Sequence, residues 1–124
     1  MNTEMLKEIE TYKNEKFILT CLDLLDKAGK LDEYMIGCLT DGSWCLKNEF
    51  MDRDKPILKE IPLETTAADL RELIKDGTSQ SRYYASTKIF NGKKYMITNY
   101  WYGPRTKHKD NRTPFLDWIR LQLL

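Results

Sequence analysis

The sequence predicts an α+β domain in which an antiparallel sheet built from two hairpins packs against N-terminal, central and C-terminal helices. Two pairs of β-prone runs are separated only by Asp41-Gly42 and by Asn91-Gly92, and both dipeptides are typical of two-residue hairpin turns. Apolar residues recur at helical spacing before, between and after these runs. The chain has 124 residues and no low-complexity linker, so residues 1–124 are expected to form a single domain.

The stretch from residue 82 to residue 102 holds the stronger hairpin signal. A turn at Asn91-Gly92 places Phe90 opposite Lys93 and Lys88 opposite Tyr95, and the same register extends the pairing to Ser86 and Ile97. Side chains alternate between the two faces of a strand. One face is expected to be core and carries Tyr83, Ala85, Thr87, Ile89, Lys94, Met96, Thr98 and Tyr100.

The opposite face of this hairpin interleaves cations with aromatic rings, through Arg82, Tyr84, Lys88, Phe90, Lys93, Tyr95, Ile97, Asn99 and Trp101. Bases stack on rings while Lys and Arg neutralise phosphates, so this composition suits a nucleic-acid platform. The alternative is that Ile97 and Trp101 are core residues of a sheet covered on both sides, because aromatic residues in strands are usually packing residues.

A second hairpin is predicted over residues 34–50, with its turn at Asp41-Gly42. Its register places Cys38 opposite Cys45, and both are expected to be reduced thiols. The alternative is a helix over residues 31–39 capped by Asp32, because short apolar runs are ambiguous by periodicity.

The remaining elements follow from apolar spacing and capping residues. Residues 5–28 form one bent helix or two helices that end at Gly29. Residues 57–61 form a short edge strand before a proline. Thr65 or Thr66 caps a helix over residues 67–74 that ends near Gly77, and Thr113-Pro114 begins the last helix.

Charge is distributed unevenly along the chain. Residues 79–124 hold nine Lys and Arg against two acidic residues, a balance of +7, while residues 1–78 carry −6. Within the basic part, residues 103–112 (GPRTKHKDNR) have no apolar side chain except Pro104 and are expected to form a surface loop. Such a basic surface suits a polyanion or the acidic half of another copy.

These features together predict a small non-enzymatic nucleic-acid-binding protein that uses the basic hairpin turn and the basic loop near aromatic residues. The sequence does not distinguish DNA from RNA. The candidate binding residues are Arg82, Lys88, Lys93, Lys94, Tyr95, Trp101, Tyr102, Arg105, Lys107, His108, Lys109 and Arg112.

Two other functions are compatible with the sequence. The first is a protein-binding regulator or inhibitor that acts through the acidic half or through the apolar C-terminal helix; the same helix could form a homodimer through Phe115, Trp118, Ile119 and Leu123. The second is a small ribonuclease with His108, the only histidine, as its general base.

Most other classes lack their motifs in this chain. No nucleotide-binding glycine loop, zinc-protease helix or serine-hydrolase elbow is present. Three cysteines without CxxC spacing and a distant histidine do not indicate a metal site. No apolar run is long enough to cross a bilayer and no secretory signal is recognisable. We therefore expect that the protein binds no cofactor and that it is located in the cytoplasm.

Overall fold

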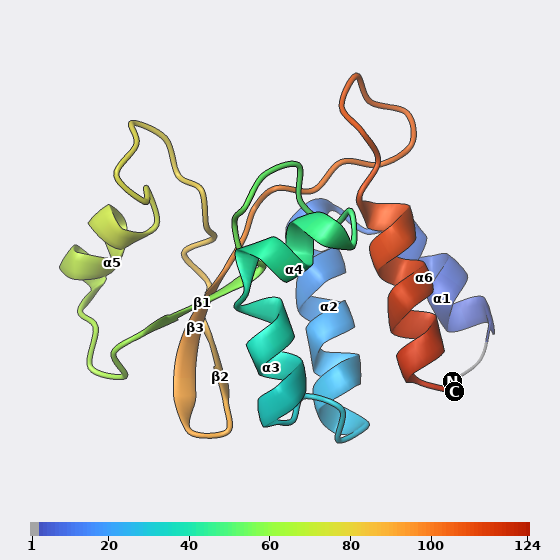
Figure 1. Cartoon of the computed structure of the whole chain (residues 1–124), viewed down its shortest axis with the longest axis horizontal. Coiled ribbons are helices and arrows are strands. Elements are labelled where there is room, and N and C mark those ends of the chain that lie inside the picture. The colour runs from blue at the N-terminus through green and yellow to red at the C-terminus, as the bar shows by residue number, and fades with distance from the viewer. Residues whose placement is uncertain (1–2) are drawn as a thin grey trace. The chain divides into compact units, whose positions relative to one another are not determined.

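The computed structural model describes residues 3–124, which form six helices and a three-stranded antiparallel sheet. The predicted α+β class is therefore confirmed. The chain folds as two compact units (Figure 1). The terminal unit holds the described chain up to Asp32 together with Trp101–Leu124, and the central unit holds Glu33–Tyr100.

The terminal unit is a group of three helices, α1 (Thr3–Glu10), α2 (Asn14–Lys27) and α6 (Arg112–Gln122), which contact one another. Their core is aromatic. The Trp101 ring lies 5.7 Å from Phe17 and 5.0 Å from Phe115 between ring centroids, and all three residues are buried. The amphipathic spacing that predicted these helices corresponds to the faces that point into this core.

Helix boundaries in the terminal unit follow capping residues. The N-terminal stretch is two helices, the second of the two forms predicted, and Gly29 ends α2 with φ +71° while Lys30 N–H donates to Leu25 O at 2.8 Å. The predicted start at Thr113-Pro114 is wrong by two positions. Helix α6 begins at Arg112 after Asn111, and Thr113 N–H donates to the Asp110 carboxylate at 3.0 Å.

The sheet of the central unit has the order β1-β3-β2, formed by β1 (Leu58–Ile61), β3 (Lys93–Ile97) and β2 (Lys88–Phe90). The Asn91-Gly92 turn is confirmed, with positive φ at both residues, +53° and +78°. Its register pairs Lys88 with Tyr95 and Phe90 with Lys93 as predicted. The predicted edge strand is also confirmed, because β1 lies at one edge of the sheet.

The hairpin register does not continue to Ser86 and Ile97 as predicted. Strand β2 is only three residues long, and beyond it Tyr83 pairs with Thr98, which shifts the pairing by two residues. The physical reason is burial. The shift brings Tyr83 into a cluster with Ile61 and Met96, while Ala85, Ser86 and Thr87 before β2 have little apolar area to bury.

The predicted second hairpin at Asp41-Gly42 is wrong, and the helical alternative for residues 31–39 is confirmed in its main part. Two helices occupy this region, α3 (Glu33–Leu39) and α4 (Gly42–Lys47). Asp41 is the N-cap of α4, where its carboxylate accepts hydrogen bonds from Ser43 N–H at 2.9 Å and Ser43 Oγ at 2.7 Å. Aspartate favours both turns and N-caps, so Asp-Gly is compatible with either structure.

Helix α5 (Ala67–Leu73) begins as predicted, with Thr66 Oγ1 accepting a hydrogen bond from Asp69 N–H at 3.1 Å. Leu70 and Ile74 pack against the Ile61, Tyr83 and Met96 cluster on one face of the sheet. The chain then leaves the helix through Asp76 and Gly77, both with positive φ. No helix among residues 3–124 has the length and apolar composition needed to span a membrane.

Candidate functional site

The twelve candidate binding residues are divided between the two units. Five belong to the central unit: Arg82, Lys88, Lys93, Lys94 and Tyr95. Seven belong to the terminal unit: Trp101, Tyr102, Arg105, Lys107, His108, Lys109 and Arg112. Each set is therefore described within its own unit.

The basic loop, residues 103–112, follows the buried Trp101 closely in the chain, and its last residue is the first residue of α6. Arg105, Lys107, His108 and Lys109 are exposed. The His108 ring stacks on the Tyr102 ring, with centroids 4.0 Å apart and an angle of 26° between the planes. Inside the loop, Thr106 Oγ1 lies 3.2 Å from the carbonyl oxygens of both Gly103 and His108.

The two ends of the basic loop are joined by hydrogen bonds between Tyr102 and Asn111. Tyr102 N–H donates to Asn111 Oδ1 at 2.7 Å, and Asn111 N–H donates to Tyr102 O at 3.0 Å. Asn111 is only 3% exposed. Asn111 was not among the predicted site residues. It occupies the N-cap position of α6, but its side-chain oxygen accepts the hydrogen bond from Tyr102 N–H.

Arg112 is held by the terminal unit itself. Its guanidinium donates to Asn14 Oδ1 at 3.0 Å and to Glu10 O at 3.2 Å, and it lies 4.2 Å from the Phe17 ring centroid. These contacts connect α6 to both N-terminal helices. Arg112 therefore has a structural role that its position in a basic run did not reveal.

Two of the candidate aromatic rings are buried. Trp101 is 1% exposed and Tyr95 is 3% exposed, so neither ring has a free face on which a base could stack. Ile97 is also fully buried. These residues have the packing role that the sequence left open as the alternative, and Tyr102 and His108 are the candidate rings that reach the surface.

The hairpin lysines of the central unit lie on different faces of the sheet. Lys93 and Lys94 are consecutive in β3, so their side chains point to opposite faces. Lys93 shares its face with Tyr95 and, through the register, with Lys88. Arg82 is exposed, and its Nε lies 3.4 Å from Thr78 Oγ1. Lys88 and Lys93 therefore share one face of the sheet, and Lys94 lies on the other face.

The residues of the suggested homodimer contact differ in exposure. Phe115 and Ile119 are fully buried, whereas Trp118 and Leu123 are half-buried. The exposed apolar residues at the end of the chain are Leu121 and Leu124. The homodimer stays a prediction, and it would have to use the half-buried and exposed residues of α6.

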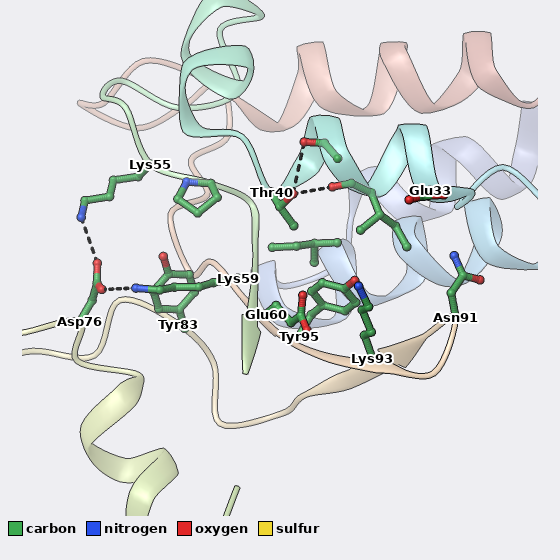
Figure 2. Close-up of a pocket in the computed structure, with 14 residues that line it drawn as sticks. Glu33, Thr40, Lys55, Lys59, Glu60, Asp76, Tyr83, Asn91, Lys93 and Tyr95 are labelled. Atoms are coloured by element: carbon green, nitrogen blue, oxygen red, sulfur yellow. Dashed lines mark hydrogen bonds and ion pairs between the residues drawn. The ribbon is translucent and has the colours of Figure 1, made fainter. Parts of the chain in front are cut away.

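The central unit contains a groove of about 740 Å³ that the sequence analysis did not anticipate (Figure 2). It lies between α3 and β1, and residues from the β2–β3 hairpin and from the segment after α5 complete it. Segments that are distant in the chain meet here, so no local sequence pattern could have indicated it. The charged residues along it are Glu33, Lys55, Lys59, Glu60, Asp76 and Lys93.

Asp76 joins two lysines at one end of this groove. Its carboxylate lies 2.7 Å from Lys59 Nζ and 3.1 Å from Lys55 Nζ, and its side chain is 14% exposed. The hydrogen bond from Lys59 and then that from Lys55 hold the pKa of the Asp76 carboxyl below its usual value. Asp76 also adopts a left-handed conformation with φ +51°.

Replacing Asp76 with asparagine tests these ion pairs without changing the backbone preference, because asparagine also tolerates positive φ. A carboxyl whose pKa is lowered by folding stabilises the protein above its unfolded pKa and loses that effect as pH falls through the folded pKa. We expect Asp76→Asn to be about 1 kcal/mol less stable than the wild type at pH 7. Below about pH 4 the difference should shrink.

Urea unfolding of both proteins at pH 7 and at pH 3 measures this effect. The matched control is Glu64→Gln, which removes one carboxylate from an exposed residue and should leave the stability nearly unchanged. Equal stability of the wild type and Asp76→Asn at pH 7 would contradict a stabilising role for the two ion pairs.

Two of the three cysteines are buried. Burial raises the pKa of the Cys21 thiol to about 12 and that of Cys45 to about 11, so both stay protonated at neutral pH and are poor nucleophiles. Within residues 3–124, no three His, Cys, Asp or Glu side chains come together as a potential metal site. The ribonuclease hypothesis for His108 stays a prediction. Comparison of the chain with protein-family models, with curated proteins and with solved structures gives no match.

Proposed function

We propose that this protein binds nucleic acid without catalysing a reaction, and that the basic loop is its principal contact surface. One observation carries the proposal. Residues 104–109 contain Arg105, Lys107 and Lys109 but no acidic residue, and these three side chains are exposed. Cations presented in this way bind a polyanion by releasing its condensed counterions.

The surroundings of the loop support the same proposal. Arg105 and Lys107 form no ion pair with any residue in the described range 3–124, so no carboxylate in that range neutralises their charge. Asp110, the one acid of the loop, accepts a hydrogen bond from Thr113 N–H at the start of α6. The positive charge of Arg105 and Lys107 is therefore available to a ligand.

The stacked rings of Tyr102 and His108 favour an unpaired strand as the ligand. A base of a single strand can stack on an exposed ring, whereas a base in a duplex is already stacked on its neighbours. His108 is exposed and Tyr102 supports it from one side. In this proposal the three cations contact phosphates and His108 contacts a base.

The proposal is tested with the triple variant Arg105→Gln, Lys107→Gln and Lys109→Gln. Binding to a fluorescein-labelled 20-nucleotide single strand, as DNA and as RNA, is measured by fluorescence anisotropy across a salt series. Each phosphate contact to a single strand contributes about 0.7 to the slope of log K against log salt concentration. We expect the variant to lose about 2 from this slope and to bind at least tenfold more weakly at low salt.

The matched control removes three exposed lysines of the terminal unit that lie outside the loop, Lys7, Lys27 and Lys30, again by replacement with glutamine. This control changes the net charge equally and should retain most of the affinity and slope. Equal losses in the two variants would show that only net charge matters. If the wild type did not bind the single strand in a salt-dependent way, the proposal would be wrong.

A further inference from the structure

The groove of the central unit follows the open edge of β1. Thr98 N–H donates to Ile57 O at 2.9 Å, and the β1–β3 register then directs the backbone groups of Lys59 and Ile61 toward β3. Backbone groups alternate along an antiparallel strand, so the N–H and C=O of Glu60 point away from β3. Within the described sheet no strand lies on that side, and Glu60 is exposed.

Residues from both faces of the sheet line the groove. Glu60 pairs with Tyr95 and shares its face, while Tyr83 packs with Ile61 and Met96 on the opposite face. Both Tyr95 and Tyr83 line the groove, and Figure 2 shows them on either side of the β1 ribbon. A groove lined from both faces encloses the edge of the strand between them, which is where an additional strand would pair.

Gly37 leaves the opposite wall of the groove open. It lies in α3 and lines the groove, and a Cβ added at this position would meet no atom within 4 Å. The α3 wall of the groove therefore has open space at position 37, where any other residue would place a side chain. The volume of about 740 Å³ is within the range of pockets that hold ligands.

The charges along the groove differ in sign between the two sides of β1 (Figure 2). On the side of Tyr83, Lys55 and Lys59 share the single carboxylate of Asp76, which leaves an excess of positive charge. On the side of Tyr95, Glu33 and Glu60 exceed the one cation, Lys93. A ligand with an acidic group on the first side and a basic group on the second would complement both.

We infer that the groove binds an extended peptide segment of a partner protein, which adds a strand to the edge of β1. Two main-chain hydrogen bonds join it to the N–H and C=O of Glu60. An acidic side chain of the peptide lies beside Lys55 and Lys59, and a basic side chain lies beside Glu33 and Glu60. This interaction is separate from nucleic-acid binding by the basic loop, so the failure of one leaves the other intact.

A library of random decapeptides displayed on phage, selected on the immobilised full-length protein, provides the probe. Selected peptides are synthesised with a fluorophore, and their dissociation constants are measured by anisotropy. We expect a β-prone sequence in which an acidic and a basic residue are separated by an odd number of positions, so that they point to opposite faces of the added strand. A tenfold or greater loss of affinity is expected when the two charges are exchanged.

Gly37→Phe should block the groove and weaken the selected peptides at least tenfold. Gly37→Ala is the matched control, because a methyl group fits the open space and should change the affinity less than threefold. Thermal unfolding of both variants verifies that they are folded. Unchanged peptide affinity in a folded Gly37→Phe variant would show that the peptides bind elsewhere and would overturn the inference.

Two further measurements separate strand addition from other modes of binding. Methylation of the peptide nitrogen that pairs with Glu60 O should weaken binding at least tenfold, and bound peptide should slow hydrogen exchange of the Glu60 amide. Equal affinity of the methylated peptide, failure to enrich any peptide, or occupation of the groove by a second copy of this chain would each refute the inference.

Discussion

Replacing Trp101 with alanine is expected to lower the free energy of unfolding by about 3–5 kcal/mol, the range for a large aromatic residue removed from a packed core. Trp101 is 1% exposed and its ring contacts those of Phe17 and Phe115. Its carbonyl oxygen also accepts a hydrogen bond from Asn14 Nδ2 at 2.8 Å. Urea unfolding followed by far-ultraviolet circular dichroism measures the loss.

Trp118→Ala is the control for this experiment, because it makes the same change at a half-buried tryptophan of the same unit. We expect it to cost about 2 kcal/mol or less, since less apolar area returns to water. The comparison also separates packing from binding. If Trp101→Ala weakened nucleic-acid binding but left the stability unchanged, the burial of the ring would not be its main role.

Replacing Gly42 with alanine is expected to destabilise the protein by about 1–3 kcal/mol, the range for forcing extra atoms into a packed site. Gly42 is the first residue of α4 and does not have positive φ. An added Cβ would lie 2.8 Å from both the Asp54 carbonyl carbon and the Lys55 nitrogen. Both atoms belong to the backbone, so the segment before β1 would have to move.

Gly37→Ala makes the same chemical change in the neighbouring helix and should have the opposite effect. Position 37 is open, and alanine is favoured over glycine within a helix by about 1 kcal/mol. Thermal and urea unfolding of the two variants gives the comparison. Equal effects of the two substitutions would contradict the close backbone approach at Gly42.

The two Gly-containing dipeptides show how far local sequence reasoning reaches. At Asn91-Gly92 the flanking residues alternate and are β-prone, so turn and strand signals agree, and the turn and the pairs next to it were predicted correctly. At Asp41-Gly42 the same turn signal precedes Ser43 and Trp44, whose backbone groups the Asp41 carboxylate can cap. A helix start and a hairpin turn share this chemistry, and the packing of Leu39 and Cys45 in the core decided between them.

The candidate site was predicted in part. The basic loop was recognisable because a run of cations without apolar residues cannot be buried at low cost. The burial of Tyr95 and Trp101 and the structural role of Arg112 were not recognisable, because an aromatic ring or a guanidinium suits a packed core and a ligand equally well. The groove beside β1 had no local signal at all.

The sequence by itself determined the elements whose signals lie within a few residues of one another. These are the amphipathic helices, the Asn91-Gly92 turn, a helix cap at Thr65 or Thr66 and the exposed basic loop, since capping, turn geometry and apolar spacing are local properties. Only the tertiary structure decided which rings are buried, where the pairing of Tyr83 shifts, and that α3, β1 and Asp76 enclose a groove. Those outcomes depend on contacts between residues distant in the chain, and the apolar area that such contacts bury outweighs local preference.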